Sequence, residues 1–478
     1  MMPLKPLFLM SPELQLALFV CLLLVLAMLL PQQQQRIGAY TALLGIGFAA
    51  ASLGVTAYSC WHVLPQNAFG YRIDSFGILF KAIALACSGL SIIASIKYLE
   101  AKSKQHCDYY ALILLAVIGM MLASSARDLI VLYLSLELSA VSTYLLVWYP
   151  GRLRSAEGAL TYYLLAMTST GILLYGMSVV YATTGETSFD AIVKAGQSDS
   201  LFSIGITLMS LGILFKVAAI PLHAWLPDTC EAAPTPVIPL LLMTNSTGYI
   251  VAITLVKLFP QNLAAGLQLI MTVTATVSMM VGNLAAATQT NLKRMLGYAG
   301  IAHSSNVMLA VALTDNKATF FYIASYCLTS AGICIVLSAL STSADDEETG
   351  EYIDDLNGLF KTNSRLGIAA TILLLSFAGI PPTCGFIAKY LVLSSVVKAD
   401  LQWQLLLIAI NVPLAFYISW RCIRAIFEDK KQQLASIDKT LLTTALLLAG
   451  LIAGTGIYPQ PLIRICDAAT AVRSQYQK

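Results

Sequence analysis

Long apolar runs separated by short polar segments follow one another along the whole chain. Fourteen runs are long enough to be spans, and they cover residues 12–30, 37–58, 76–96, 109–125, 128–148, 159–181, 201–222, 236–259, 265–285, 294–313, 318–340, 369–393, 403–426 and 440–458. A helix needs about 20 apolar residues to cross a bilayer, and most connections between the runs are short. The pattern predicts an all-α membrane protein with about 14 transmembrane helices in a single polytopic domain over residues 1–478.

The composition narrows the class of protein. The chain is 58% hydrophobic and 11% charged, with a mean hydropathy of +0.76, whereas a soluble chain is about 25% charged. These values exclude a soluble enzyme, a disordered protein and a nucleic-acid binder, and the net charge of +3 is too small to imply an anionic partner. The first run lacks a small-residue cleavage site, which predicts a retained span instead of a signal peptide.

Basic residues are distributed unevenly between the loops, which predicts the orientation of the chain. If the N-terminus lies outside, the inward loops carry 15 lysines and arginines and the outward loops carry 6. Cytoplasmic loops are enriched in these residues, so both termini are predicted on the outer side. The acidic stretch from Asp345 to Asp355 then faces inward. It is either a solvated loop or a docking surface for a partner.

Two of the spans contain proline where a continuous helix is expected. Span seven reads LGILFKVAAIPLHAWLPD with Pro221, and span twelve reads LLLSFAGIPPTCGFIAKYLVL with Pro381 and Pro382. Proline removes a helix hydrogen bond, and paired broken helices in two halves of a transporter point to ion or substrate sites. The breaks lie five spans apart, which predicts two inverted five-helix repeats, about 109–259 and about 265–426.

Few ionisable residues lie inside the spans, and such residues are candidates for function. Glu137 lies near the middle of span five, Lys216 lies shortly before Pro221, and Lys389 follows the break in span twelve. A buried carboxylate and a buried lysine each resist ionisation when alone and restore each other's charge when close. We therefore predict proton handling, with a salt bridge between helices as the alternative. Lys81 lies near the outer end of span three, where its stem could snorkel to the interface, but for this lysine we favour the salt bridge between helices.

Two histidines are further candidates because imidazole titrates near neutral pH and can relay protons. His303 lies inside span ten and is predicted to be a relay. His223 lies just past the break in span seven, where a proton relay and a helix-end hydrogen bond are both plausible. Asp228 and Glu231 follow in a polar turn. We interpret them as interfacial structure, with a proton entry as the less favoured alternative.

The chain offers no visible site for a cofactor. No two of the ten cysteines form a C-x-x-C pair, and no cysteine or histidine cluster has zinc or iron–sulfur spacing. Neither a dinucleotide-binding G-x-G-x-x-G after a strand nor a Walker-type loop is present. We predict that the cysteines are small buried hydrophobic residues, and that NADH, flavin, ATP and clusters do not bind to this chain.

Several segments resemble the antiporter-like membrane subunits of respiratory complex I (NADH:quinone oxidoreductase). The resemblance rests on RDLIVLYLSLELSAVSTYLLV, SAEGALTYYLLAMTSTGILLYG, FKVAAIPLHAWLPDTCEAAPTPV, NLKRMLGYAGIAHSS and GIPPTCGFIAKYLVL, which occur in the family's order along nearly the whole chain. Within the family the chain looks most like bacterial subunit N. It stops soon after span fourteen, unlike subunit L with its lateral helix, and it has Lys389 where subunit M has a glutamate.

The resemblance implies a role for each charged position. Glu137 and Lys216 match one half-channel, and Lys389 matches the other, which leads outward. A family lysine in span eight joins the two halves, but here Asn245, Ser246 and Thr247 occupy that region and Lys257 lies at the outer end. Hydroxyl groups, water and His303 could bridge the halves, or proton transfer could be weakened.

The resemblance also implies the setting of the chain. It would couple electron transfer from NADH to quinone to proton translocation in the bacterial inner membrane, with both termini on the periplasmic side. NADH, FMN, iron–sulfur clusters and quinone would bind to other subunits, and the partners would be complex I membrane subunits and lipid. Protons would be its only small-molecule substrate. The alternatives are an Mrp-type cation/proton antiporter subunit and an assembly scaffold with residual charges.

Overall fold

Helices form almost all of the regular structure. The computed structural model describes residues 10–31, 36–60, 66–68, 70–102, 107–149, 151–195, 200–256, 261–342, 350–429 and 437–474. The main helices are α2 (Ser11–Leu29), α3 (Ile37–Cys60), α4 (Ser75–Lys102), α5 (Cys107–Ser125), α6 (Leu129–Trp148), α7 (Leu153–Thr184), α9 (Ser200–Lys216), α11 (Ile238–Leu255), α12 (Gln261–Thr288), α13 (Leu292–Ala312), α14 (Asn316–Thr342), α16 (Ser364–Ala378), α17 (Cys384–Lys398), α18 (Gln402–Ile426) and α19 (Lys439–Ile457). The remaining elements are α8 (Phe189–Lys194), α10 (Trp225–Ala232), α15 (Leu359–Thr362), α20 (Gln460–Ser474), the 3-10 turns η2 (Thr235–Val237) and η4 (Ile353–Leu356), and the strands β1 (Gln66–Ala68) and β2 (Tyr71–Ile73).

Eleven helices in the described part of the chain are long and apolar enough to cross a membrane, which makes this a multi-pass helical membrane protein. Three predicted spans are not among the eleven. Spans seven and twelve are broken, so that α9 and α16 are shorter apolar helices. Span ten corresponds to α13, whose polar residues lower its hydropathy. Nearly every residue of α13 is buried, so protein and not lipid surrounds these polar groups.

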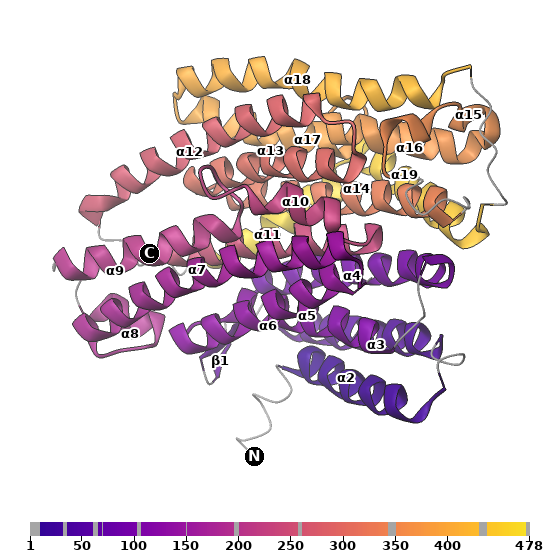
Figure 1. Cartoon of the computed structure of the whole chain (residues 1–478). Helices are drawn as coiled ribbons and strands as arrows, with labels where there is room; N and C mark the ends of the chain where they lie inside the picture. Colours follow the sequence, from indigo (N-terminus) through magenta and orange to yellow (C-terminus); the bar gives the residue numbers. More distant parts are fainter. Residues whose placement is uncertain are drawn as a thin grey trace.

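The most buried helices lie in the middle of the bundle. α11 and α14 are 89% and 94% buried, whereas α2, α18 and α19 are about one third buried or less. Figure 1 shows α2 and α3 on one side of the molecule, α18 and α12 on the other, and α11 and α14 between them. A polar side chain on a central helix is therefore shielded from lipid, which is the usual location of functional polar residues in membrane proteins.

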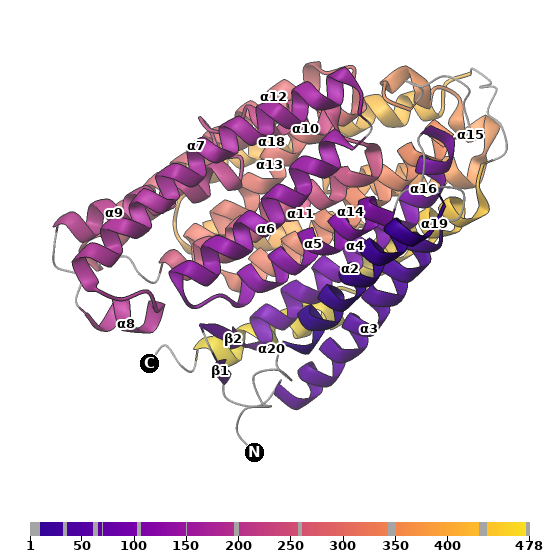
Figure 2. The same cartoon turned by 60° about the horizontal axis from the view of Figure 1, so that its bottom comes forward.

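The bundle has two ends, which we name by their features. The hairpin face carries the antiparallel strands β1 and β2 together with α8 and α20, and α15 lies at the opposite end (Figure 2). We call that end the Lys293 face, because Lys293 pairs there with Glu351 in the segment before η4 and α15. The amphipathic helix α20 was not predicted, because it contains no long apolar run. It is fixed to the hairpin face by a 2.8 Å hydrogen bond from Ser75 Oγ to the Ala469 carbonyl and by a 3.1 Å ion pair between Lys317 and Asp467.

Two short antiparallel bridges of the same design lie at the starts of α6 and α13. At the hairpin face, Asp128 pairs with Ser188, and at the Lys293 face, Asn291 pairs with Tyr352. Asp128 and Asn291 each cap the helix that follows by accepting backbone N–H bonds. In each bridge the residue after the cap donates across the pair, Leu129 to the Thr187 carbonyl at 2.9 Å and Leu292 to the Glu351 carbonyl at 2.6 Å. The chain thus repeats one local arrangement at its two opposite faces.

Candidate functional site

The break in span seven begins with a capped helix end. α9 ends at Lys216, and Ala218 takes a left-handed conformation with φ of +53°. The Ala218 N–H donates to the Phe215 carbonyl at 2.9 Å, and the Ala219 N–H donates to the Leu214 carbonyl at 3.1 Å. This is the pattern by which a left-handed residue satisfies the last carbonyls of a helix. The chain then runs through a cis peptide bond before Pro221 and enters α10.

The break in span twelve has the same backbone. α16 ends at Ala378, and Gly379 is left-handed with φ of +77°. The Gly379 N–H donates to the Ser376 carbonyl and the Ile380 N–H donates to the Leu375 carbonyl, both at 3.0 Å. A cis peptide bond precedes Pro382. In both breaks the left-handed residue stands three positions before the cis proline. The two segments can therefore be aligned in sequence position by position.

Other helices satisfy the backbone groups that the first break frees, as an apolar environment requires. The Trp225 indole N–H donates to the Phe215 carbonyl at 3.2 Å, and Ser304 Oγ donates to the Val217 carbonyl at 2.8 Å. The Ile220 N–H donates to Ser278 Oγ at 2.9 Å. These partners come from α10, α13 and α12, so the first break is held by its neighbours.

Glu137 and Lys216 line one small cavity between α6, α7 and α9. Glu137 Oε1 accepts a 2.8 Å hydrogen bond from Thr170, and Lys216 Nζ donates to the Leu136 carbonyl at 3.2 Å. The cavity has a volume of about 30 Å³, which is enough for water. Among the described residues, no ion pair within 4.0 Å joins the two charged groups. The structure therefore brings the predicted pair to one cavity and leaves room for water between its members.

Lys389 is fixed by the second break itself. Its ammonium group donates to the Ala378 carbonyl at 2.7 Å, which occupies the position of the Val217 carbonyl in the first break. The lysine stem lies directly over Gly379, where a Cβ atom would stand 2.5 Å from Lys389 Cδ. Glycine is needed at this position for its left-handed backbone and for the space that the lysine occupies.

His303 lies on α13 between the two breaks. It is buried, and its Nδ1 lies 2.9 Å from the Tyr322 hydroxyl. Its ring packs against Tyr326 and against Phe377 of α16, with ring centroids 4.8 and 4.4 Å apart. Ala388, the residue before Lys389, lines the same small cavity as His303. The structure thus places His303 next to the second break and not beside Glu137.

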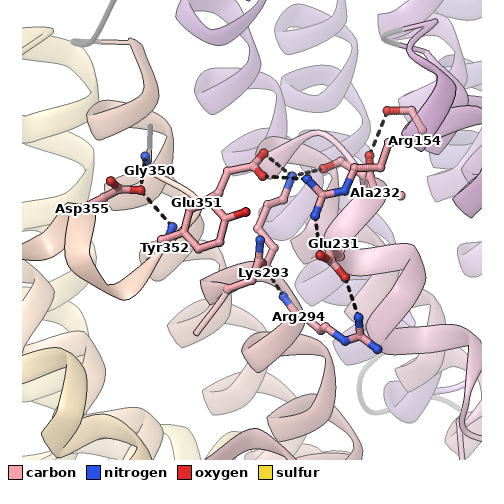
Figure 3. A network of polar contacts seen from close by, with 12 residues as sticks. Arg154, Glu231, Ala232, Lys293, Arg294, Gly350, Glu351, Tyr352 and Asp355 are labelled. Carbon is pink, nitrogen blue, oxygen red and sulfur yellow. Dashed lines mark hydrogen bonds and ion pairs between the residues drawn. The ribbon is translucent and has the colours of Figure 1, made fainter. Parts of the chain in front are cut away.

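His223 lies in the turn after Pro221 and is partly exposed. Its Nδ1 is 3.3 Å from the Pro221 carbonyl, so it contacts its own turn. Asp228 and Glu231 on α10 form ion pairs with Arg294, at 3.2 and 3.1 Å. Figure 3 shows that Glu231 also contacts Arg154 of α7. These carboxylates link α10 to its neighbouring helices, in agreement with their interpretation as interfacial structure.

A buried ion pair at the Lys293 face was not predicted from the sequence. Lys293 is almost completely buried and pairs with Glu351 at 2.7 Å, while its ammonium also donates to the Ala233 carbonyl at 3.0 Å (Figure 3). Arg154 lies 3.5 Å from the same glutamate. The network joins the ends of α7, α10 and α13 to the segment before η4. Within the predicted acidic stretch, residues 345–348 lie outside the described residues, and Asp355 accepts the N–H groups of Gly350 and Tyr352 at 2.9 Å.

Lys81 forms the salt bridge between helices that we favour for it from the sequence, and its stem does not snorkel. Lys81 is 1% exposed and does not reach the interface. Its ammonium forms a 2.8 Å ion pair with Glu13 of α2 and contacts the Tyr71 hydroxyl, which itself donates to Glu13 at 2.8 Å. The start of α2 and the hairpin close over the lysine in the folded chain. The sequence does not identify the partner of Lys81, because Glu13 lies at the edge of the first apolar run.

Among the described residues, no group of three or more histidine, cysteine, aspartate and glutamate side chains is placed to hold a metal ion. A cavity of about 260 Å³ lies between α9, α11 and α12, and its described lining contains Val217 and Tyr249 but no charged residue. The charged groups of the breaks are therefore the chemistry that the site offers.

The fold and the site define a class of protein, a polytopic membrane protein with ionisable residues at two broken helices. Residues 126–415 match the family model described as "NADH:quinone oxidoreductase/Mrp antiporter, TM". The chain is 32% identical to NADH-quinone oxidoreductase subunit N of Dehalococcoides mccartyi, over 95% of this chain and 97% of that protein. This chain belongs to the NADH:quinone oxidoreductase/Mrp antiporter family of membrane subunits.

Solved structures agree with this assignment. A chain of respiratory complex I from Thermus thermophilus with bound aureothin is 26% identical, with a TM-score of 0.82 over 96% of this chain and 99% of that chain. A chain of the Mrp complex from a Dietzia species is 18% identical, with a TM-score of 0.85 over 97% of each chain. At that identity the second likeness concerns the fold alone.

Proposed function

We infer that this chain is a proton-translocating membrane subunit of an NADH:quinone oxidoreductase, working with other membrane subunits of complex I. The observation that carries this inference is the 32% identity to a subunit N along 95% of the chain, together with Lys216 and Lys389 at two matched helix breaks. Electron transfer from NADH to quinone supplies the free energy. We place NADH, FMN, the iron–sulfur clusters and quinone on other subunits.

The charged residues divide the work between two half-channels. Glu137 and Lys216 share a cavity large enough for water. Each group can therefore change the protonation of the other without movement of the helices. Lys389 receives the proton in the second half, His303 relays it, and His223 lies at the entry past the first break. Moving one charge across the membrane costs about 2.3 kcal/mol per 100 mV, which coupling to electron transfer must provide.

We further propose 14 membrane crossings and two inverted five-helix repeats, about 109–259 and about 265–426. The matched breaks support the repeat, since each has a left-handed residue three positions before a cis proline. The matched bridges support the inversion, because Asp128 and Asn291 start equivalent helices at opposite faces. The excess of basic residues in the loops of the Lys293 face favours a cytoplasmic location for it. The chain would then lie in the bacterial inner membrane with both termini on the periplasmic side.

The proposal is tested by Glu137→Gln and Lys216→Ala in the assembled complex. Each variant should lower proton pumping and quinone reduction together, because quinone reduction in a coupled complex depends on proton translocation. Pumping is measured in inverted membrane vesicles with NADH and normalised to the content of the complex. Glu157→Gln is the matched control, since Glu157 is an exposed carboxylate on α7 outside the cavity. Normal pumping in both test variants would overturn the proposal.

The composition of the purified complex separates this function from cation/proton antiport. Redox subunits and NADH:quinone activity are expected to copurify with the chain. Copurification with further antiporter subunits only, together with exchange of Na⁺ for H⁺ across vesicles, would favour the antiporter instead.

A further inference from the structure

The two half-channels must be connected in the centre of the bundle, and α11 has no lysine there. Its middle carries Asn245, Ser246 and Thr247, and Lys257 lies outside the described residues. The Ser246 and Thr247 hydroxyls donate to carbonyls of their own helix, at 3.2 and 3.3 Å. Asn245 is buried, and its Oδ1 has no hydrogen-bond partner among the described residues. The connection therefore depends on other groups near this level.

One face of α11 lies directly against the first break. Asn245, Gly248 and Tyr249 share this face, because residues three and four apart on a helix are neighbours. A Cβ atom on Gly248 would stand 2.6 Å from Val217 Cγ1 and 3.4 Å from Lys216 Cγ. The missing side chain at Gly248 is what allows this close approach. Tyr249, one residue further along, is thereby held at the carbonyl of Val217, the residue that follows Lys216.

Tyr249 and Ser304 form a hydroxyl pair at the carbonyl that the break frees. Ser304 Oγ donates to the Val217 carbonyl at 2.8 Å, and the Tyr249 hydroxyl lies 3.4 Å from the same oxygen. The two hydroxyls also contact each other directly. Both side chains are buried. A hydroxyl can accept one proton and donate another, so this pair can pass a proton while staying neutral.

The same segment of α13 leads to the second break. Ser304 follows His303, whose ring packs against Tyr326 and Phe377 and whose Nδ1 is 2.9 Å from the Tyr322 hydroxyl. A small cavity of about 10 Å³ beside His303 is lined by Ser376 and by Ala388, the neighbour of Lys389. Tyr326 Oη is buried without a hydrogen-bond partner among the described residues. Polar groups on this segment of α13 thus lie beside both breaks.

We propose that the Tyr249–Ser304 hydroxyl pair connects the two half-channels in place of a lysine in span eight, with His303 as the receiving group. The proposal rests on the proposed function. The Lys216 ammonium releases a proton to the Tyr249 oxygen, and Tyr249 gives its own proton to Ser304. Ser304 then gives its proton to His303. Each hydroxyl gains one proton and loses one, so Lys216 becomes neutral and His303 becomes an imidazolium. Water carries the proton where two side chains do not touch.

This relay also accounts for onward transfer. A positive His303 beside Lys389 places two like charges close together, which favours release of the Lys389 proton outward. His303 then passes its own proton to the neutral Lys389 amine. The connection carries charge only while a proton passes, whereas a lysine in span eight would carry it at rest.

The experiment compares two tyrosines in the assembled complex. Tyr249→Phe removes the proposed relay. We expect proton pumping with NADH to fall roughly tenfold, which is less than the roughly 100-fold low end for loss of a proton-transfer group, because water can still carry part of the proton flux. Tyr109→Phe is the matched control, because Tyr109 is a buried tyrosine that pairs with Ser95 at 2.9 Å outside the link. Equal pumping in the two variants, at the same content of the complex, would overturn the proposal.

A rescue variant separates a relay from a packing effect. Asn245→Lys places an amine on the same face of α11, one turn from Tyr249, and it should restore at least half of the pumping to Tyr249→Phe. A loss that Asn245→Lys does not relieve, in a complex that assembles normally, contradicts the relay. Glu137→Gln and Lys216→Ala are assayed beside them. Normal pumping in both would refute the proposed function itself, whereas loss of pumping in these two variants with normal pumping in Tyr249→Phe would refute only the relay.

Discussion

The two helix breaks share a backbone and differ in what holds them. In the first, Ser304 and Tyr249 meet the freed Val217 carbonyl, and Lys216 points elsewhere, to the Leu136 carbonyl beside Glu137. In the second, Lys389 itself meets the equivalent carbonyl. Among the described residues, no carboxylate lies within 4.0 Å of Lys389 Nζ. The Lys216 ammonium therefore bonds a carbonyl outside its break, whereas the Lys389 ammonium bonds a carbonyl of its own break.

This difference has a consequence for charge. A lysine at the C-terminal end of a helix is stabilised by the helix dipole and by the last carbonyls. Lys389 obtains this stabilisation from α16, so losing its proton weakens its hydrogen bond to the Ala378 carbonyl, which a neutral amine donates without the help of a charge. Lys216 can lose its proton while the first break keeps its hydroxyl and indole partners. Proton transfer in the second half is thus coupled to the geometry of the break, and in the first half it is coupled to Glu137.

The largest effect is expected from Gly379→Ala. The new Cβ would be forced into a left-handed backbone and against the stem of Lys389, at 2.5 Å from Cδ. We expect a loss of about 2–3 kcal/mol in stability, seen as a lower temperature of inactivation. The displaced lysine should lower pumping roughly tenfold. Both are measured on the assembled complex.

Ala218→Gly is the matched change in the first break. Ala218 is also left-handed, at φ of +53°, so glycine relieves strain there and pumping should stay within about twofold of the parent. An equal loss in the two variants would mean that Lys389 is not tied to its break more closely than Lys216.

The sequence predicted the helices well because their signal is direct. The backbone N–H and C=O groups of an apolar run in lipid must form their hydrogen bonds within the protein, which favours a helix. Every predicted span coincides with a helix or with two helices on either side of a break. The hairpin, α8 and α20 were missed, since these elements are short or amphipathic and depend on contacts such as that between Ser75 and the Ala469 carbonyl. Composition alone contains no information about such contacts.

The site was predicted in part for the same reason. Charges at Glu137, Lys216 and Lys389 are visible because they interrupt apolar runs, and the structure places all three at or beside the breaks. Their partners are not visible, because they come from distant segments. Glu13 meets Lys81, and Glu351 meets Lys293, only after the helices have packed. The backbone partners of the breaks, such as Ser278, are ordinary polar residues in sequence and gain meaning only from their contacts.

A smaller effect is expected from Ser278→Ala, which acts on the first break alone. It removes the acceptor of the Ile220 N–H, a loss of about 1–2 kcal/mol for a buried donor left unpaired. The second break has Pro381 at the position of Ile220, counted from the cis proline, and proline has no N–H to satisfy. The inactivation temperature of the complex reports the loss, and the Ser376→Ala complex reports the cost of a serine change in the other break.

A double variant tests the reason for this difference. Ile220→Pro removes the donor, as Pro381 does in the second break, so Ser278→Ala should cost nothing further in its presence. The inactivation temperature of the double variant should equal that of Ile220→Pro alone. Additive losses would show that Ser278 stabilises α12 by some contact other than the Ile220 N–H.

The smallest effect is expected from Trp225→Phe. Trp225 donates to the Phe215 carbonyl in the first break, whereas Phe386 stands at the matching position after the second break and has no N–H to donate. The substitution removes one hydrogen bond and keeps a ring to stack on Tyr162, whose centroid lies 4.5 Å away. We expect a loss of about 1 kcal/mol and pumping within about twofold of the parent. A loss as large as that of Gly379→Ala would show that the indole bond, and not the left-handed cap, holds the first break together.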